Sequence, residues 1–421
     1  MTIASAPVPG ARRAALLFIF ITVLIDVLSF GLIIPVLPHL IENFVGGDTA
    51  KAAYWVGVFG TVFAAIQFVF SPIQGALSDR YGRRPVILLS CLGLGLDFIL
   101  MAVVNTLPLL LVGRIIAGIT AASFTTANAY IADITPPEQR AKSFGMIGAA
   151  FGVGFVIGPV IGAYLGEIDL RLPFWFSAGL ALLNFLYGLF VLPESLPPEK
   201  RTPRFDWSHA NPFGALVLLR RYPQVFGLAA VVFIANMAHY VYPSIFVLFA
   251  DYQYHWGLRE VGWVLLVVGV FNIIVNVGLV GRVVARLGER RALLLGLSCG
   301  VTGFVIYGLA GTGWLFLLGL PISALWAMAA PATQALITRQ VGADAQGRIQ
   351  GALMSLVSLA GVLGPALFAG SFGYFIGKHT PLHLPGAPWF IAAALLAVGV
   401  AIAWRFARAP APAAPAADAT V

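Results

Sequence analysis

The chain has 421 residues, of which 60% are apolar and only 10% are charged, and its mean hydropathy is +0.92. Soluble globular proteins carry roughly 45–50% apolar and about 25% charged residues, so this composition excludes a water-soluble enzyme. A disordered chain is excluded too, because disorder requires low hydrophobicity. The composition therefore predicts an all-α membrane protein that crosses the bilayer several times.

Apolar runs long enough to cross a bilayer, which takes about 20 helical residues, recur along the whole chain. They begin near Ala14, Tyr54, Pro85, Leu107, Ser143, Pro173, Pro223, Val261, Ala292, Trp314, Ile349 and Ala387. The sequence thus predicts 12 transmembrane helices. The first run follows Arg12-Arg13 as a secretory signal would, but it continues past Asp26 without a cleavage site, so it is a span.

The basic residues are distributed unevenly between the two sides of the predicted membrane. With the N-terminus inside, 20 of the 25 Lys and Arg fall on inner segments and 4 on outer loops, and Arg114 alone lies within a span. The positive-inside rule then predicts that both termini are cytoplasmic in a multi-pass protein of the inner membrane. The net charge of +8 reflects this topology, and no nucleic-acid partner is expected.

Two halves of the chain repeat each other at an offset of 206 residues. Gly75–Arg84 maps onto Gly281–Arg290, and Gly158-Pro159 maps onto Gly364-Pro365. This duplication predicts two pseudo-symmetric six-helix bundles with a substrate site near mid-membrane between them. The predicted parts are a cytoplasmic N-terminus at 1–13, a bundle at 14–192, a polar cytoplasmic linker with an amphipathic helix at 193–222, a bundle at 223–408 and a disordered Ala- and Pro-rich tail at 409–421.

Three charged residues fall deep inside predicted spans. Asp26 and Asp97 each lie about 12 residues, or roughly 18 Å, from the cytoplasmic end of a span, and Arg114 lies at a similar level. Such charges are costly and mark functional sites by default. Two acids and one base leave one negative charge over, which suits proton coupling. We expect Asp26 to carry the proton, Arg114 to sense it, and Asp97 either to line the path or to pair with Arg114; a purely structural Asp–Arg pair is the alternative.

Other polar and glycine residues fit a pocket and a hinge. Amides and aromatics at mid-span suit a large, mostly apolar ligand. The candidates are Gln67, Asn128, Asn236, His239, Tyr240, Asn272, Asn276, Trp326 and Gln334, each of which could instead serve helix packing. The run Gly154, Gly158, Pro159 and Gly162 follows no strand, so it fails the context of a dinucleotide-binding loop and predicts close helix packing with a bend. No cysteine or histidine cluster indicates a metal or cofactor.

Several motifs together resemble the major facilitator superfamily over the whole chain. Gly75–Arg84 resembles the family's loop between spans 2 and 3, Arg114–Gly118 its span 4 motif, and Gly154–Gly162 the span 5 motif of antiporters. Ser78-Asp-Arg-Tyr-Gly-Arg-Arg-Pro-Val, Leu96-Asp97-Phe and Ile131-Ala-Asp133 resemble the tetracycline-efflux branch, a group of drug:proton antiporters.

The resemblance implies a cytoplasmic gate built from the loop between spans 2 and 3. Alternating charges at such a seam can hold one conformation and release another. The implied gate residues are Gly75, Asp79, Arg80, Gly82, Arg83, Arg84 and Asp133. In the second copy Ala285 replaces Asp79, so the gate is expected to be asymmetric.

The resulting functional expectation is a monomeric efflux transporter, not an enzyme, that exchanges an amphiphilic drug-like molecule for a proton by alternating access. The proton gradient drives it without a cofactor. A proton-coupled symporter that takes up a metabolite is the alternative. Residues 297–301 lack the acid typical of span 9 in the tetracycline branch, and Asn272 stands where that branch has a span 8 His, so tetracycline and other amphiphiles both remain candidate substrates.

Overall fold

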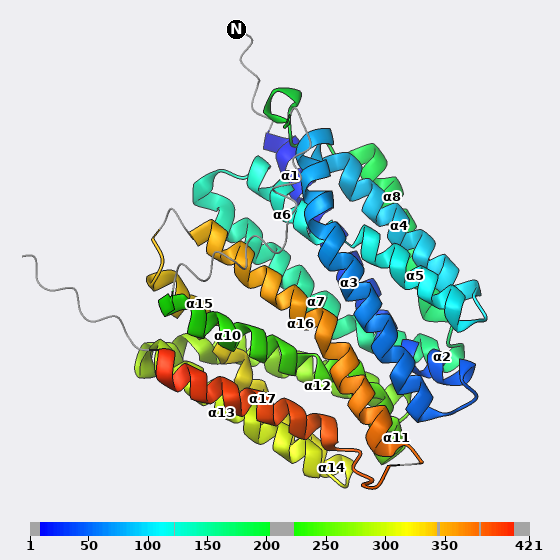
Figure 1. Ribbon diagram of the computed structural model, residues 1–421. Helices are drawn as coiled ribbons and strands as arrows, with labels where there is room; N and C mark the ends of the chain where they lie inside the picture. The colour runs from blue at the N-terminus through cyan, green and yellow to red at the C-terminus, as the bar shows by residue number, and fades with distance from the viewer. Residues whose placement is uncertain (1–8, 122, 203–222, 343–345, 379, 408–421) are drawn as a thin grey trace, which may run out of the picture. The chain divides into compact units, whose positions relative to one another are not determined.

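The computed structural model describes residues 9–121, 123–202, 223–342, 346–378 and 380–407, and within these ranges the regular structure is entirely helical (Figure 1). The prediction of an all-α protein is therefore confirmed. The amphipathic helix expected within residues 203–222 and the tail expected at 409–421 lie outside the described residues.

The helices follow one another with short connections. Those before the linker are α1 (Pro9–Ile33), α2 (Leu37–Phe44), α3 (Thr49–Tyr81), α4 (Arg83–Val103), α5 (Leu107–Thr120), α6 (Ser123–Ile134), α7 (Pro137–Ile168) and α8 (Leu172–Val191). Those after it are α10 (Pro223–His239), α11 (Val241–Tyr254), α12 (Leu258–Ile273), α13 (Val280–Leu309), α14 (Gly313–Ala324), α15 (Ala329–Arg339), α16 (Gln346–Ile376) and α17 (Ala387–Phe406).

Within the described residues, ten helical segments are long and apolar enough to cross a membrane. One of them, Leu258–Leu309, has 52 residues and would extend about 78 Å at 1.5 Å per residue, which is far more than one crossing needs. Its helix breaks at Gly288, whose backbone has φ 76° and ψ 163°. This segment holds two of the runs predicted from the sequence.

Glycine sets the turn between α3 and α4. Gly82 has φ 106°, a conformation that a residue with a Cβ rarely adopts, so the chain can end one helix and begin the next within a single residue. The break at Gly288 lies 206 residues further on, at the position that the sequence repeat assigns to it. The two copies of the loop therefore share the same backbone feature as well as similar residues.

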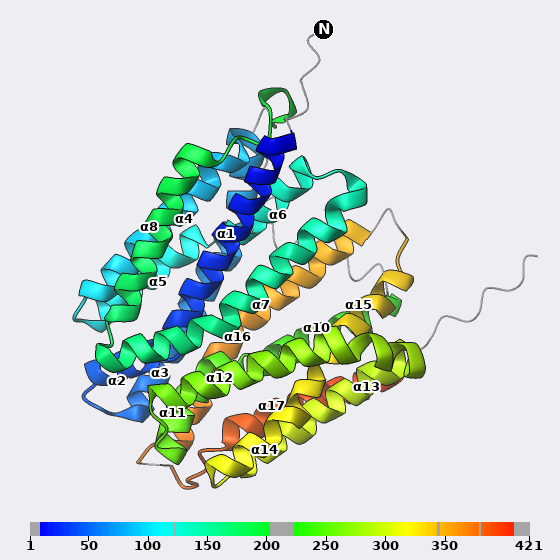
Figure 2. The same ribbon diagram turned by 180° about the vertical axis from the view of Figure 1, so that it is seen from behind.

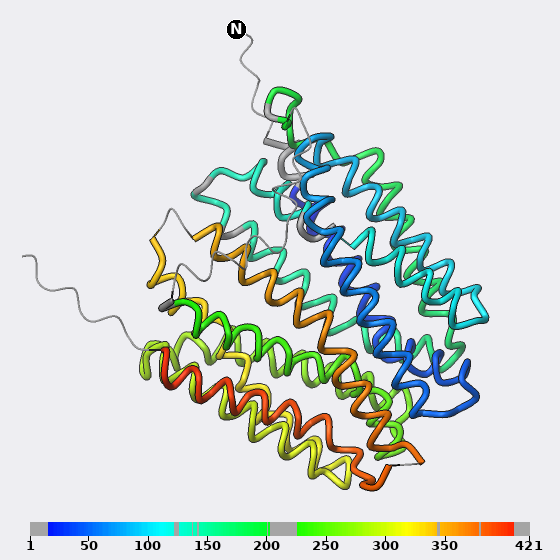
Figure 3. The backbone as a smooth tube through the Cα atoms, viewed as in Figure 1, coloured from blue at the N-terminus to red at the C-terminus, as the bar shows by residue number. Residues whose placement is uncertain are grey.

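The chain forms two compact units, each assembled from separate stretches. The first comprises Met1–Pro212, Val241–Val270 and Gly361–Pro385, and the second comprises Phe213–Tyr240, Phe271–Ala360 and Gly386–Val421. In the first unit α1 packs most extensively against α7, and α4 against α8 (Figure 2). In the second unit α17 packs against both α13 and α10 (Figure 3).

Each unit has its own buried core. In the first, apolar side chains of α1, α4, α6 and α7 meet around Phe18, Ile87 and Tyr130. In the second, aromatic rings make the centre: Tyr307 stacks on Phe316 with 4.2 Å between ring centroids, and Trp389 meets Tyr307 edge-on at 5.1 Å. Stacked and edge-on aromatic pairs of this kind fix helix positions through geometry as well as buried area.

Candidate functional site

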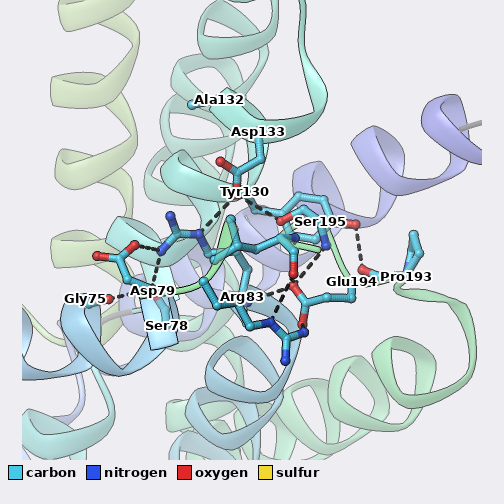
Figure 4. Close-up of polar contacts among 12 residues, drawn as sticks. Gly75, Ser78, Asp79, Arg83, Tyr130, Ala132, Asp133, Pro193, Glu194 and Ser195 are labelled. Carbon is cyan, nitrogen blue, oxygen red and sulfur yellow. Dashed lines mark hydrogen bonds and ion pairs between the residues drawn. The ribbon is translucent and has the colours of Figure 1, made fainter. Parts of the chain in front are cut away.

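The guanidinium of Arg83 is the centre of the predicted gate motif (Figure 4). It lies 2.5 Å from Asp79, at the end of α3, and 3.1 Å from Asp133, at the end of α6. It also donates to the hydroxyl of Ser78 at 2.6 Å. The Arg83 side chain is only 11% exposed, whereas Asp79 and Asp133 are 48% and 23% exposed, so the contacts are shielded from solvent on the arginine side alone. The structure thus brings together the three charged residues that the motif implies, and Arg83 joins the ends of α3, α4 and α6.

The segment after α8, which is predicted to begin the polar linker, also belongs to this cluster. One carboxylate oxygen of Glu194 accepts hydrogen bonds from the backbone N–H groups of Arg83 (2.8 Å), Ser195 (3.0 Å) and Leu196 (3.1 Å). The Ser195 hydroxyl donates to Asp133 at 3.1 Å. The hydroxyl of Tyr130 donates to the carbonyl of Pro193 at 2.8 Å. These contacts hold the start of the linker on the loop (Figure 4).

Glu194→Ala is expected to loosen this attachment. Three backbone donors would lose a charged acceptor, and hydrogen bonds to charged groups contribute about 1.5–3 kcal/mol, which partial exposure reduces here to about 1–2 kcal/mol. Hydrogen exchange of residues 193–202 should therefore become faster while the spans stay protected. Glu199→Ala, in the same segment, is the matched control. Unchanged exchange in the Glu194 variant would show that the attachment does not depend on this carboxylate.

The remaining residues of the motif have smaller roles in the structure. Arg84 donates to the carbonyl of Leu189, near the end of α8, at 2.6 Å. Arg80 is exposed, with its guanidinium 5.1 Å from the centre of the Tyr81 ring. The carbonyl of Gly75 accepts from Ser78 at 2.8 Å.

Asp97 and Arg114 form a buried ion pair between α4 and α5. Arg114 Nη2 lies 2.7 Å from Asp97 Oδ2, and the two residues are 9% and 0% exposed. The same Arg114 nitrogen contacts the sulfur of Met101, and the guanidinium lies 5.9 Å from the centre of the Phe63 ring. Of the two arrangements expected for Asp97, lining the path or pairing with Arg114, the structure shows the pair with Arg114.

Asp26 lies half-buried on α1, in the middle of the first apolar segment. One helical turn earlier, the buried hydroxyl of Thr22 donates to Asn184 of α8 at 3.2 Å, and the Asn184 amide contacts Cys91 at 3.5 Å. Thr22 and Asn184 thus form a polar network on the same side of the unit as Asp26. Neither residue is among those predicted from the sequence.

The glycines of the span 5 motif bring the backbones of α1 and α7 into direct contact. A Cβ on Gly158 would lie 2.8 Å from the carbonyl oxygen of Leu28, and a Cβ on Gly162 would overlap the carbonyl of Leu32. Gly154 faces Leu28 in the same way, at 3.0 Å from its nitrogen, and the ring of Pro159 faces Gly31. Small residues at four-residue spacing therefore act here as a packing surface, as expected for membrane helices.

Gly162→Ala is expected to destabilise the protein, because the added methyl group meets backbone that cannot rotate away. Overpacking of this kind costs about 1–3 kcal/mol. Gly152→Ala on the same helix is the control, since no atom of the described residues lies within 4 Å of its new methyl group. Thermal unfolding in detergent should show a lower midpoint for the first variant only. Equal midpoints would mean that the α1–α7 contact is not tightly packed.

The candidate pocket residues belong to both units. Gln67 on α3 and Asn128 on α6 lie in the first and are half-buried. In the second unit, the rings of His239 and Trp326 lie 5.8 Å apart. There too, the Asn276 amide donates to the carbonyl of Asn272 at 3.0 Å, and the Asn236 amide donates to Val232 of its own helix. Tyr240 is half-buried and Gln334 is exposed.

Several of the pocket candidates in the second unit lie where a helix is irregular. His239 ends α10 and Tyr240 separates it from α11. Asn276 lies in a π-helical turn at Ile274–Leu279, and Trp326 lies in a 3₁₀ turn at Leu325–Met328. These two turns pack against each other. Interrupted helices in membrane proteins leave backbone groups for binding, and π-turns are frequent at functional sites.

Charged residues on α2 and α11 form a further cluster that the sequence did not reveal. The imidazole of His39 lies 3.7 Å from Glu42 and 3.8 Å from Asp251. The ligand atoms of these three residues all lie within 4.8 Å of one another, a spacing that could also hold a cation. Nearby in the same unit, Arg259 forms an ion pair with Glu167 at 2.5 Å. The His39–Asp251 contact joins residues 212 positions apart in the chain, and the Arg259–Glu167 pair joins residues 92 positions apart.

Glu42 gives this cluster a pH dependence. Burial opposes ionisation of its carboxyl group, but hydrogen bonds with His39 and Thr49 outweigh burial, so its pKa lies below the usual 4.5. The charged form therefore stabilises the folded protein above pH 4.5, and this contribution disappears as the pH falls through the lowered pKa. Glu42→Gln should accordingly unfold at a lower temperature than the wild type at pH 7, and at the same temperature at a pH below the lowered pKa. An equal difference at both pH values would contradict this origin.

The apolar helices, the buried ion pair and the glycine packing define a multi-pass membrane protein. Comparison with known proteins defines its family. The chain belongs to the major facilitator superfamily, whose family model matches residues 19–365. The class C tetracycline resistance protein of Escherichia coli is 37% identical over 91% of this chain and 95% of its own length. The class H protein of Pasteurella multocida is 34% identical over 92% and 94%.

More distant similarities agree with this family. Multidrug resistance protein 2 of Bacillus subtilis is 28% identical over 94% of this chain and 96% of its own length. The human organic anion transporter MFSD10 (TETRAN) has a TM-score of 0.68 at 23% identity, with 93% of this chain and 99% of that one covered. The nucleoside transporter NupG has a TM-score of 0.74 at 13% identity, with 94% and 100% covered. These two structural matches show the fold alone.

Proposed function

We propose that this protein is a secondary active transporter that exports an amphiphilic, tetracycline-like molecule in exchange for a proton. The observation that carries the proposal is the similarity to six tetracycline resistance proteins, at 33–37% identity over 91–95% of the chain. Relatives named for drug resistance favour export over the uptake symporter that the sequence left open. The proton gradient supplies the energy, so the proposed mechanism needs no cofactor.

The proposed architecture is 12 transmembrane helices in two six-helix bundles, at 14–192 and 223–408, joined by the cytoplasmic linker at 193–222. The split of Leu258–Leu309 at Gly288 and the division of one predicted span between α5 and α6 support this count. The excess of Lys and Arg on inner segments supports cytoplasmic termini in the inner membrane. We take the monomer as the transporting unit, and alternating access as rocking of the two bundles.

Asp26 is the proposed proton carrier. Arg114 and Asp97 neutralise each other in a buried pair, so the first span contributes a further carboxylate at mid-membrane. A carboxylate inside a span marks a proton or substrate path by default. Thr22 and Asn184 supply hydrogen-bonding groups one turn away. Protonation of Asp26 from one side and release to the other would couple the gradient to the conformational change.

The Arg83 cluster is the proposed cytoplasmic gate. A conformational latch needs contacts that are specific but reversible, and ion pairs at the ends of three helices provide them. The carboxylates of Asp79 and Asp133 bind one guanidinium from two sides. The glycine contact between α1 and α7 would act as the hinge element that moves with the span carrying Asp26.

We place the second unit's contribution to the drug pocket at its interrupted helices. His239, Tyr240, Asn276 and Trp326 combine aromatic surfaces with polar groups, which suits an amphiphile with ring systems. Gln67 and Asn128 are the proposed contributions of the first unit. Each pocket residue is a candidate for binding, and none is assigned to proton transfer.

Drug uptake into inverted membrane vesicles tests the proposed function. Inverted vesicles that contain the protein and have an acidified lumen should accumulate tetracycline or another amphiphile from a drug panel. Vesicles without the protein should not. If no drug of a broad panel accumulates although folded protein is present, the export proposal is wrong, and metabolite uptake becomes the better account.

A further inference from the structure

The second copy of the loop contains an ion pair at the position of the first, with its charges exchanged. The offset of 206 residues maps Arg83 onto Glu289 and Asp133 onto Arg339. Arg339 Nη2 lies 2.5 Å from Glu289 Oε1, just as Arg83 lies against Asp133. The first pair joins the start of α4 to the end of α6. The second joins α13, immediately after its break, to the end of α15.

Two neighbouring features repeat at the same offset. Gly82 and Gly288 both have positive φ, at 106° and 76°. Arg84 and its counterpart Arg290 both donate through Nη2 to a carbonyl near the end of the last helix of their half, that of Leu189 at 2.6 Å and that of Trp404 at 2.9 Å. The Glu289–Arg339 pair therefore lies in a local structure equivalent to that of Arg83 and Asp133, and it is not a chance surface contact.

We propose that Glu289 and Arg339 form a second cytoplasmic clamp, the counterpart of Arg83 and Asp133 with reversed polarity, and that both are positioning residues for transport. This rests on the proposed function only as regards transport. Asp133 and Arg339 lie at the end of the fourth helix of each predicted half. Each clamp thus fixes this helix end against the start of the third helix, and a carrier in which both halves rearrange needs such a joint in each.

The two clamps differ in how firmly they are built. Arg83 also binds Asp79 and Ser78, whose counterparts are Ala285 and Val284, and these cannot bind a charged partner in the same way. Arg83 and its counterpart Glu289 are similarly buried, at 11% and 17% exposed, but Arg339 is 60% exposed where Asp133 is 23% exposed. The Glu289–Arg339 pair lines an open cavity of about 400 Å³ together with Arg290, Arg291 and Trp404. The second clamp is therefore a single, solvent-accessible contact.

This difference determines how each clamp should respond to charge reversal. Glu289 is the only acid in residues 282–291, a stretch that contains four arginines and no lysine. Glu289→Arg adds a charge to this basic stretch and repels Arg339. Arg339→Glu places a second carboxylate next to Glu289. The guanidinium groups of Arg290 and Arg291 can neutralise these two carboxylates. We expect the first change to be the more damaging of the two, and the double exchange to restore the pair.

A double-mutant cycle tests the second clamp. Glu289→Arg, Arg339→Glu and the double variant are compared for vesicle transport and for thermal unfolding in detergent. Glu289→Arg should reduce transport about tenfold, and the double variant should recover most of it. The corresponding exchange of Arg83 and Asp133 should not recover, because Arg83 would also lose Asp79 and Ser78. Arg291→Glu, in the same cavity, is the control and should transport normally.

Each result decides the proposal. Recovery in the double variant supports it, and so does a coupling between the two substitutions in the unfolding temperature. Additive effects in both measurements, with wild-type amounts of folded protein, would overturn it. If the wild type exports no drug, the proposed function fails, but the coupling in thermal unfolding still shows whether the clamp exists.

Discussion

Asp26→Asn is expected to abolish gradient-driven efflux while leaving drug binding and drug exchange intact. Asparagine has nearly the same shape as aspartate but cannot take up or release a proton. Loss of a group that transfers a proton typically costs about 100- to 10,000-fold in rate, so uptake driven by a pH gradient should fall by at least about 100-fold. Exchange of labelled for unlabelled drug across the membrane needs no net proton movement and should continue.

The position of Asp26 explains why its carboxylate should be the coupled one. It lies half-buried in a spanning segment, beside a network formed by Thr22, Asn184 and Cys91, while Arg114 is engaged by Asp97. Asp26→Glu keeps an ionisable group and should retain part of the gradient-driven rate. Gradient-driven uptake at the wild-type rate in the Asn variant would assign coupling to another residue.

Arg114→Gln is expected to remove most of the folded protein from the membrane. The substitution leaves the Asp97 carboxylate, which is 0% exposed, without its counter-charge. Breaking a buried ion pair in this way costs about 3–5 kcal/mol, a large part of a total stability of about 5–15 kcal/mol. Fluorescence-detected size exclusion of the extracted protein should show a strongly reduced folded peak.

A double variant tests whether the loss of stability comes from the unpaired Asp97 charge. Asp97→Asn with Arg114→Gln removes both charges, so it should fold better than Arg114→Gln alone. Arg114→Lys should recover only part of the stability, because lysine cannot reproduce the planar guanidinium between Asp97, Met101 and the Phe63 ring. A normal folded peak for Arg114→Gln would show that the pair contributes little to the fold.

Features set by hydrophobicity and local motifs could be predicted from the sequence. The apolar runs indicated the all-helical class, and the loop motif placed Asp79 and Arg83 four residues apart across Gly82, where the structure pairs their side chains. The similar depth of Asp97 and Arg114 left their pairing open, and the structure shows it. The glycine motif predicts close helix packing, and Gly158 and Gly162 lie against the backbone of α1.

Contacts between distant segments and backbone groups could not be predicted in this way. Glu194 accepts hydrogen bonds from the backbone N–H groups of Arg83 and of its own neighbours. Because every residue type except proline has such a group, the side chains give no sign of these contacts. His39 and Asp251 are 212 positions apart and carry no motif. The Glu289–Arg339 pair has the opposite charges at the positions of Arg83 and Asp133, so residue identity between the two halves does not indicate it. The helix interruption at Tyr240 lies inside a single predicted span.

Proton movement in inverted vesicles tests the central claim most directly. After the lumen is acidified, addition of tetracycline or another amphiphile should release protons from vesicles that contain the wild-type protein. Vesicles with the Asp26→Asn variant, present at the same folded amount, should release none. Proton release that is equal in the two samples, or absent with every drug in the presence of folded wild-type protein, would contradict drug–proton exchange through Asp26.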